Sequence, residues 1–336
     1  MGYNVAVVGA TGAVGTQLLQ ILGERRFPLA GLRLLASPRS AGLEVEMAGR
    51  KHTVEAISAE AFDGVQLAFF AASTGVSRDW VPVARQRGAV VIDKSNAFRL
   101  DPTVPLVVPE VNAHALSDHH GIIASPNCST IQLVVVLEVI ERISPLRLVV
   151  VSTYQSVSGT GRRAMEELRE NWQALAAGRS PLASVYPHPI GCNVLPHIDS
   201  FERSGYSLEE MKLVNETRKI LNRQDLQVIA TAVRVPVMIG HAESVYVETD
   251  ELVPADMLRR QMERKPGIVV EDDPDRARYP LPALAAGQDK VYVGRLRNDL
   301  FGRNGLAFWV VADNLRKGAA TNAVQIAEEL VERDLI

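Results

Sequence analysis

The sequence predicts an α/β protein in which a doubly wound, mostly parallel sheet is followed by an α+β domain. Three features support this prediction: an apolar strand that ends in a glycine-rich loop, strand and helix patterns that alternate up to residue 127, and longer strand patterns after it. At roughly 100–200 residues per domain, the 336-residue chain has room for two domains. We expect the first domain at residues 1–127, the second at 128–313 and a last segment, with a C-terminal helix, at 314–336.

The first strand pattern, at residues 4–9, runs into a glycine loop and an amphipathic helix over 16–22. The loop follows the spacing G-x-x-G-x-x-G, in which missing side chains let backbone N–H groups at a helix start approach a pyrophosphate. Its place after the first strand favours dinucleotide binding over an ordinary glycine turn. The loop residues expected at the cofactor are Gly9, Thr11, Gly12, Ala13 and Val14.

The second strand pattern, at residues 32–36, ends in Ser37-Pro38-Arg39-Ser40, where no acidic residue occurs. A domain that prefers NAD usually has an acid at this place, to hold the ribose 2′-hydroxyl. Arg39, with Ser37 and Ser40, would suit a 2′-phosphate instead, so the sequence favours NADP. The alternative is an exposed surface arginine.

The next patterns are a strand at residues 66–71, a helix at 76–87 and a strand at 89–93. Small residues after the first of these strands, Ser73 and Thr74 among them, would let a cofactor lie across the carboxyl ends of the strands. In the loop after residue 93, Arg99 could clamp an anion or form a surface salt bridge.

Cys128 follows a strand end and a proline turn, and an apolar helical pattern over residues 131–143 comes directly after it. The N–H groups and the dipole at a helix start stabilise a thiolate and lower the pKa of a cysteine, which makes it nucleophilic. The same N–H groups, with the Asn127 amide, could hold an oxyanion. Cys192 has no comparable setting, and we expect it to be a small core residue.

Composition excludes other classes of protein. The 36 Lys and Arg residues against 39 Asp and Glu residues give a net charge of −3, without the cationic excess typical of nucleic-acid binding. No apolar run approaches the roughly 20 residues that span a membrane, and the residues before the first strand lead us to expect no secretory signal. Two cysteines are too few for a disulfide framework, so we expect a cytoplasmic protein. His188, Cys192 and His197 lack a recognised metal-ligand spacing, and we expect no metal.

Two segments, Gly9-Ala10-Thr11-Gly12-Ala13-Val14-Gly15 and Ser125-Pro126-Asn127-Cys128-Ser129-Thr130, together resemble the aspartate-β-semialdehyde dehydrogenases. Further matches occur at residues 153–159, 214–219, 234–241 and 313–320. The resemblance implies an NADP-dependent enzyme that interconverts L-aspartyl-4-phosphate and L-aspartate 4-semialdehyde, in diaminopimelate, lysine, methionine, threonine and isoleucine biosynthesis. It implies a Rossmann-like first domain, a second domain like that of glyceraldehyde-3-phosphate dehydrogenase, a last helix that returns to the first domain, and a homodimer.

The resemblance also assigns roles. Cys128 matches the nucleophile of the family, His241 its acid/base residue, and Gln155 the residue that orients the substrate and the acyl intermediate. Arg234 matches the residue that binds the substrate α-carboxylate. A separation of seven along one regular strand would turn Arg234 and His241 to opposite faces, so we expect Pro236 and Gly240 to interrupt the strand.

A helix predicted at residues 208–221 carries Lys212, Glu216 and Lys219 on one face. By itself this spacing is also typical of a solvated charge ladder. The resemblance implies that Glu216 binds the substrate ammonium, and that Lys219, with Lys212 as second candidate, joins Arg99 in holding phosphate.

Asn314 would be the N-cap of the last helix, predicted at residues 315–330. The resemblance implies that Asn314 also reaches the nicotinamide, and it places Ser158 and Gly159 at the cofactor.

Strand patterns at 226–234, 244–248, 291–297 and 306–311 predict a sheet in the second domain with one face against helices, and we expect its other face to pair with a second subunit. Residues 272–279 are expected to form an exposed loop.

Two alternative functions stay open. A related enzyme, such as an N-acetylglutamyl-phosphate reductase or a malonyl-CoA reductase, would share fold, cysteine and cofactor. A catalytically silent NADP-binding protein would have no need of Cys128 and His241.

Overall fold

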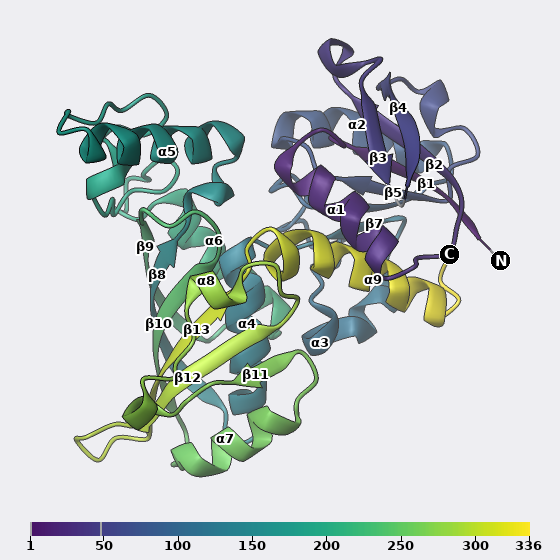
Figure 1. Ribbon diagram of the computed structural model, residues 1–336. Coiled ribbons are helices and arrows are strands. Elements are labelled where there is room, and N and C mark those ends of the chain that lie inside the picture. Colours follow the sequence, from purple (N-terminus) through teal and green to yellow (C-terminus); the bar gives the residue numbers. More distant parts are fainter. Residues whose placement is uncertain (1, 48) are drawn as a thin grey trace. The chain divides into compact units, whose positions relative to one another are not determined.

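A seven-stranded sheet forms the first of two units in the computed structural model, which describes residues 2–47 and 49–336 (Figure 1). This unit comprises Met1–Asn127 and Ala319–Ile336, and its strand order is β3-β4-β2-β1-β5-β6-β7. All neighbouring strands are parallel except β3 and β4. The strands are β1 (Tyr3–Val8), β2 (Leu29–Ala36), β3 (Glu44–Met47), β4 (Arg50–Ala56), β5 (Leu67–Phe70), β6 (Val90–Asp93) and β7 (Ile122–Ala124).

Alternate side chains of β1 enter two separate cores. Val5 and Val7 pack with α1 (Ala13–Glu24) and α9 (Thr321–Glu332) on one face of the sheet, whereas Val8 packs with α2 (Thr74–Gln86) on the other. A strand that is covered on both faces is apolar throughout, which explains the unbroken apolar run of the sequence here. A short helix, α3 (Pro109–Asn112), lies against α9. The doubly wound sheet therefore agrees with the prediction.

The second unit, Cys128–Gly318, contains a mixed six-stranded sheet in the order β11-β12-β13-β10-β8-β9. Its pairs β8–β9 and β11–β12 are parallel, and the other three are antiparallel. The strands are β8 (Leu146–Gln155), β9 (Gln227–Arg234), β10 (His241–Thr249), β11 (Ile268–Val270), β12 (Val291–Asn298) and β13 (Gly305–Ala312).

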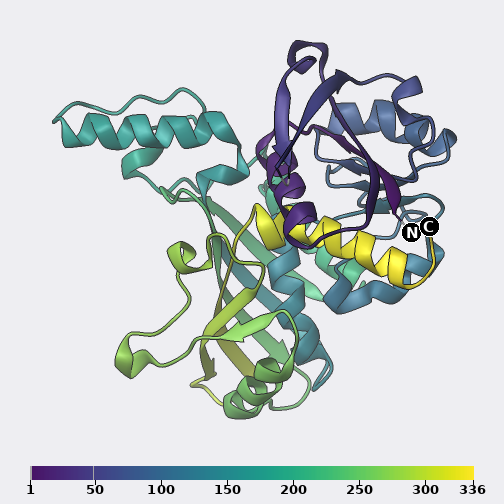
Figure 2. The same ribbon diagram turned by 45° about the vertical axis from the view of Figure 1, so that its right-hand side comes forward.

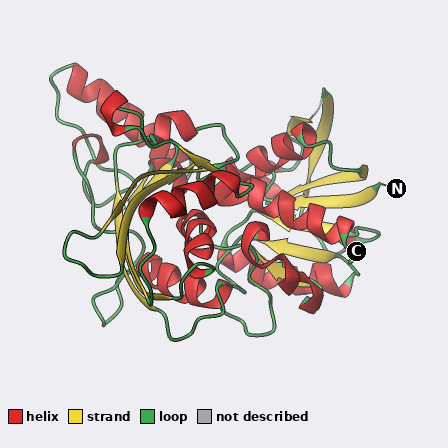
Figure 3. Cartoon of the chain, turned by 90° about the horizontal axis from the view of Figure 1, so that it is seen from below, coloured by secondary structure: helices red, strands yellow, loops and turns green. Residues whose placement is uncertain are grey.

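One face of this sheet curves around helices, as Figure 3 shows. The central helix is α4 (Cys128–Glu141), which contacts four of the strands and is buried from Ser129 to Ile140. The remaining helices of this unit are α5 (Arg162–Ala176), α6 (Leu208–Ile220), α7 (Ala255–Arg264) and the short α8 (Pro282–Ala285). In Figure 2, α5 extends away from the sheet of its own unit.

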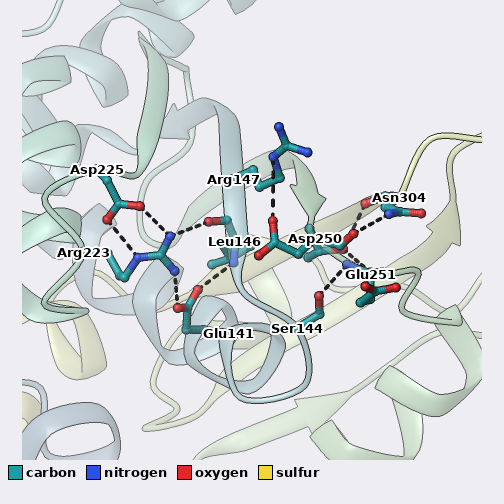
Figure 4. A network of polar contacts seen from close by, with 10 residues as sticks. Glu141, Ser144, Leu146, Arg147, Arg223, Asp225, Asp250, Glu251 and Asn304 are labelled. Carbon is teal, nitrogen blue, oxygen red and sulfur yellow. Dashed lines mark hydrogen bonds and ion pairs between the residues drawn. The ribbon is translucent and has the colours of Figure 1, made fainter.

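Polar contacts fix the start of β8 (Figure 4). Arg223, which follows α6, donates to Asp225 at 3.0 and 2.8 Å, to the carbonyl of Leu146 at 3.0 Å, and to Glu141 at the end of α4. The backbone N–H of Leu146 in turn donates to Glu141 at 2.8 Å. The hydrogen bonds from Arg223 lower the pKa of Asp225 to about 2. These contacts join α4, β8 and the turn between α6 and β9, so they set the position of the strand that ends at Gln155.

Two of these expectations from the sequence are wrong, and a third holds in part. Cys192 is exposed on a 3₁₀ turn, because Ile190 two residues earlier takes the place in the core. The segment 272–279 is exposed only from Pro274 on, since the Asp272 carboxylate is buried and pairs with Arg259 at 2.8 Å. The last helix begins at Thr321 and not at residue 315, because a π-helical turn at Arg316–Ala320 precedes it.

Candidate functional site

The glycine loop between β1 and α1 leaves no room for side chains. Gly9 has a φ of 82°, and a Cβ there would collide with the carbonyl of Ala71, while a Cβ on Gly15 would collide with the carbonyl of Gly9. Gly12 is the N-cap of α1 and supplies no side-chain cap to the first N–H groups of the helix. A loop of this kind accepts a phosphate close to its backbone, so these residues fit a bound dinucleotide.

Three predicted cofactor segments follow neighbouring strands of the first unit. The glycine loop follows β1, the turn at Pro38–Ser40 follows β2, and Ser73 and Thr74 follow β5 and begin α2. Because β2, β1 and β5 are parallel and adjacent, these segments lie at one edge of the sheet, where open α/β sheets bind ligands. Arg39 is exposed there.

Arg99 lies at the carboxyl ends of β6 and β7 within the first unit. It is 5% exposed, and its guanidinium donates to the carbonyl oxygens of Ser125 at 3.0 Å and of Lys94 at 2.7 Å. These two carbonyl contacts fix the position of the guanidinium.

Cys128 is the first residue of α4, as expected, and Asn127 comes directly before it. A Cβ on Gly318 would lie 3.0 Å from the Cβ of Cys128, so the absence of a side chain at Gly318 lets the π-helical turn approach this cysteine. The chain therefore presents Cys128 at a helix start with closely packed surroundings.

Gln155, Arg234 and His241 come together where three strands of the second unit end or begin. Gln155 and Arg234 are the last residues of β8 and β9 and are register partners, and His241 is the first residue of β10. The chain leaves β9 after Arg234 and turns at Gly240, where φ is 95°. Because the two residues belong to different strands, the seven-residue spacing does not separate their side chains.

Arg234 and His241 both approach Gly159 closely. A Cβ on Gly159 would lie 3.1 Å from Nη1 of Arg234 and 3.2 Å from Nε2 of His241. The Arg234 side chain is 5% exposed and donates to the carbonyl of Ser156 at 2.7 Å, while its Nε has no hydrogen-bond partner among the described residues. A buried guanidinium N–H of this kind can bind a carboxylate, and an imidazole nitrogen lies next to it.

The tautomer of His241 follows from its backbone contact. The N–H of Ser156 donates to Nδ1 at 3.0 Å, so Nδ1 carries no proton and Nε2 of the neutral ring does. The hydroxyl of Ser156 also lies 3.1 Å from Nδ1. The neutral ring therefore presents an N–H donor on its Nε2 side, where Gly159 lies.

Asn314 is not the N-cap of the last helix. Its amide oxygen accepts hydrogen bonds from the hydroxyls of Ser156 and Ser158, each at 3.0 Å, and from the N–H of Gly240 at 2.9 Å. The carboxylate of Asp313 instead accepts from the N–H groups of residues 315 and 316. Sequence reasoning missed Ser156, whose only signal was its place in the matched segment 153–159.

The polar face of α6 is not a solvated charge ladder, because Glu216 is 1% exposed. Lys212 pairs with Asp199 at 2.9 Å and with Glu209 at 3.1 Å. Burial lowers the pKa of Lys212, but the charges of Glu209 and Asp199 outweigh that effect and raise it. Two carboxylates thus engage Lys212. Sequence reasoning missed Glu209, which looked like an ordinary acidic residue at a helix start.

Neither a metal cluster nor a membrane span is found in residues 2–47 and 49–336. No group of three or more His, Cys, Asp or Glu side chains in these ranges could hold a metal ion, and no helix in them is long and apolar enough to cross a membrane.

Comparison with known proteins identifies both units. Residues 4–119 match the NAD binding domain of semialdehyde dehydrogenases, and residues 138–317 match the dimerisation domain of semialdehyde dehydrogenases. The aspartate-semialdehyde dehydrogenases of Aquifex aeolicus and Bacillus subtilis are 49% and 48% identical. The first alignment covers 100% of each chain, and the second covers 100% of this chain and 99% of the relative.

Solved structures of aspartate semialdehyde dehydrogenases are similar to this chain over nearly its whole length. Aspartate semialdehyde dehydrogenase II from Vibrio cholerae has a TM-score of 0.96 and 44% identity over 99% of both chains. The same enzyme complexed with ASA has a TM-score of 0.94 and 45% identity, again over 99% of both chains. The fold alone is shared with the enzyme from Candida albicans with NADP, at a TM-score of 0.76 and 23% identity over 100% of both chains.

Proposed function

Because this chain belongs to the aspartate-semialdehyde dehydrogenase family, we propose that it reduces L-aspartyl-4-phosphate to L-aspartate 4-semialdehyde with NADPH, releasing phosphate. The reverse reaction oxidises the semialdehyde with NADP⁺ and inorganic phosphate. We place the reaction in the cytoplasmic biosynthesis of diaminopimelate, lysine, methionine, threonine and isoleucine. The convergence of Arg234 and His241 on Gly159 supports this proposal best, because it sets a carboxylate-binding group beside a proton donor.

Covalent catalysis by Cys128 begins the reductive direction. The thiolate adds to the acyl carbon of aspartyl phosphate, the C–O bond to phosphate breaks, and a thioester on Cys128 results. The Nε2–H of His241 donates a hydrogen bond to the oxygen that becomes negative, and the Asn127 amide supports the same oxygen until the carbonyl re-forms. NADPH, when bound by the first unit, would supply the hydride for the acyl carbon of the thioester. The C–S bond then breaks, and Cys128 leaves as thiolate while the semialdehyde forms.

Other side chains hold the substrate. Arg234 binds its α-carboxylate, Glu216 its ammonium and Gln155 the acyl group. Lys219 and Arg99 hold the phosphate in this scheme. Lys212, which pairs with Asp199 and Glu209, is the second candidate for this role.

The cofactor is held by the segments that follow β1, β2 and β5, and its nicotinamide end by Ser158, Gly159 and Asn314. In this scheme Arg39 binds the 2′-phosphate, which NADP carries and NAD lacks. This contact should therefore set the preference for NADP. We expect Arg39→Ala to raise the KM for NADP⁺ about tenfold, as for loss of one charge-assisted contact, and to leave the KM for NAD⁺ unchanged.

Arg50→Ala is the matched control for this change. Arg50 is also exposed in the first unit but begins β4, at the edge of the sheet opposite to the one where β2 ends. Initial rates with both cofactors test the expectation. A 2′-phosphate contact would be contradicted if Arg39→Ala and Arg50→Ala raised the KM for NADP⁺ equally. It would also be contradicted if Arg39→Ala raised the KM for NADP⁺ and the KM for NAD⁺ equally.

The dimerisation domain indicates that the protein forms oligomers, and we propose a homodimer. The face of the second sheet that is turned away from α4 carries Tyr154 and Trp309, whose rings lie 5.3 Å apart, and the exposed Ile229. Apolar side chains of this kind on a sheet face suit a second subunit.

The reaction is tested by mixing purified protein with L-aspartate 4-semialdehyde and NADP⁺ and following NADPH absorbance with and without inorganic phosphate. We expect reduction of NADP⁺ that depends on phosphate. N-acetylglutamate 5-semialdehyde with phosphate, and malonate semialdehyde with coenzyme A, serve as the competing substrates. A faster reaction with either of these, or no reaction from protein that binds NADP⁺, would rule out the proposed substrate.

A further inference from the structure

The guanidinium of Arg234 is a buried positive charge, and no carboxylate in residues 2–47 and 49–336 pairs with it. The side chain is 5% exposed, and Nη1 donates to the carbonyl of Ser156 at 2.7 Å. A buried charge is costly unless neighbouring groups stabilise it. One carbonyl contact leaves most of the guanidinium surface for a further neighbour.

The aromatic ring of Tyr186 lies beside this cation. Cζ of Arg234 is over the ring, 5.9 Å from its centroid, which is within the range of a cation–π interaction. The hydroxyl of Tyr186 donates to Oγ1 of Thr160 at 2.9 Å and so fixes the far end of the ring. Burial raises the pKa of Tyr186, although the charge of Arg234 and the contact with Thr160 act against it, so the ring is uncharged near neutral pH.

An aromatic neighbour leaves the donors of Arg234 available. A protein carboxylate would bind the N–H groups in the plane of the guanidinium, and a substrate carboxylate needs the same groups. A ring contacts the flat face instead. Nε of Arg234 has no hydrogen-bond partner in the part of the chain that the structure describes, and Nη1 lies beside Gly159. The ring therefore stabilises the cation without competing with a ligand.

Two buried polar residues of α5 hold the chain on either side of Tyr186. Glu167 accepts hydrogen bonds from the N–H and the hydroxyl of Ser184, each at 2.8 Å. Asn171 accepts the N–H of Gly191 at 2.9 Å. Glu167 and Asn171 are each 2% exposed, so these contacts are shielded from water. The helix that extends away from the sheet in Figure 2 thus sets the position of the segment that carries Tyr186.

We propose that Tyr186 is a positioning residue for substrate recognition: its ring holds the Arg234 guanidinium by the flat face, so that the N–H groups stay aligned for the α-carboxylate. This inference rests on the proposed function for the identity of that carboxylate. The contact between ring and guanidinium is independent of any substrate.

Tyr186→Leu tests the role, because leucine keeps an apolar side chain for the surrounding core cluster but has no ring face. We expect the KM for the semialdehyde to rise about fivefold, the scale of one partly shielded cation–π contact. The kcat should stay near the wild-type value, because Tyr186 acts through Arg234 and not on the reacting atoms. Tyr186→Phe keeps the ring, so its KM should also stay near that of the wild type.

Val185→Ala is the matched control, because Val185 packs against the same apolar cluster from the same segment. It should lower the melting temperature and leave the KM for the semialdehyde unchanged. The proposal would be overturned by an unchanged KM in Tyr186→Leu, or by an equal rise of KM in Val185→Ala.

A pair of rings at residue 186 separates the electrostatic contact from packing. Phenylalanine and trifluorophenylalanine have nearly the same shape, but fluorine withdraws electron density from the ring face that attracts a cation. We expect a higher KM for the semialdehyde with trifluorophenylalanine, at an equal melting temperature. Equal KM values would overturn the proposal, and this comparison also decides the question if Tyr186→Leu does not fold.

A substrate without the α-carboxylate gives a second readout. 3-Aminopropanal keeps the aldehyde and the ammonium of aspartate semialdehyde and lacks the carboxylate. Tyr186→Leu should lower kcat/KM for the semialdehyde and leave kcat/KM for 3-aminopropanal unchanged. An equal loss with both aldehydes would show a general structural defect and would overturn the positioning role.

A measurement without substrate separates this inference from the proposed function. In ¹⁵N-labelled protein the Nε–H signal of Arg234 is identified by its loss in Arg234→Lys. A ring face over the guanidinium shifts this proton signal upfield, so we expect a downfield shift in Tyr186→Leu and little change in Tyr186→Phe. An unchanged signal in Tyr186→Leu would overturn the contact. The expected shift in a protein that does not oxidise the semialdehyde would support the contact and count against the proposed substrate.

Discussion

Replacing Cys128 by serine is expected to lower kcat for phosphate-dependent oxidation of the semialdehyde by about 10³-fold or more. A serine hydroxyl has almost no anionic form near neutral pH, so the covalent step loses its nucleophile. Serine is also no larger than cysteine, and the close approach of Gly318 to this residue creates no clash in the variant. NADP⁺ affinity and the melting temperature should stay near the wild-type values, and both are measured beside the initial rates.

Cys192→Ser is the control, because it makes the same change at the only other cysteine of the sequence. Cys192 is exposed, whereas Cys128 is partly buried. Faster alkylation of Cys128 than of Cys192 at mildly acidic pH would therefore reflect reactivity and not access. Retention of more than a tenth of the wild-type kcat in Cys128→Ser would rule out a thioester at this residue.

The elements around the cofactor loop could be predicted because their signals are local. An apolar run that is covered on both faces, three glycines at fixed spacing and a helical pattern occur within residues 4–22, and β1, the loop and α1 follow from them. Asn314 shows the opposite case. Residues 315–330 read as one helix, yet the turn before Thr321 is shaped by Asp313, which caps two N–H groups, and by the approach of Gly318 to Cys128. Such contacts between distant segments have no local pattern.

Some residues of the candidate site could likewise be predicted from a local signal, and others could not. Cys128 could be found from its place at a helix start, but His241 was one of seven histidines and was singled out by resemblance alone. His241 lies near Arg234 because β9 ends at Arg234, β10 begins at His241, and both strands pair with β8. Glu209 could not be separated from Glu210 in the sequence, because only the packing of α6 on β9 sends one toward Gln155 and the other toward Ala232.

Replacing Glu243 by glutamine is expected to make the protein more stable than the wild type at pH 8 and to weaken the dependence of its stability on pH. Glu243 lies on β10, two residues after His241, and is fully buried. Among the described residues its carboxyl oxygens and the amide of the buried Gln132 have no hydrogen-bond partner of good geometry. Burial raises the pKa of Glu243 well above its ordinary value, and the nearby Gln132 amide offsets only part of that. The carboxyl group is therefore protonated in the folded protein under conditions where an exposed one is ionised.

The sign of the effect follows from proton binding. In the unfolded chain a glutamate loses its proton near pH 4.3, while the folded chain keeps the proton of Glu243 to higher pH. Between these two pKa values the folded state binds more protons, so the free energy of unfolding falls as pH rises, by up to about 1.4 kcal/mol per pH unit for this one group. Its stabilising contribution is complete below the unfolded pKa and is lost as pH rises through the folded one.

Urea unfolding between pH 4 and pH 8.5 measures this difference. The curves of wild type and Glu243→Gln should diverge steadily above pH 4.5, with the variant the more stable. Glu248→Gln is the control on the same strand, because Glu248 is only partly buried and contacts Tyr246 and Arg303. Parallel curves for wild type and Glu243→Gln would mean that Glu243 is ionised in the folded protein. A negative charge would then lie on the face of β10 that carries His241, where it would favour an imidazolium over the neutral ring that the Ser156 contact requires.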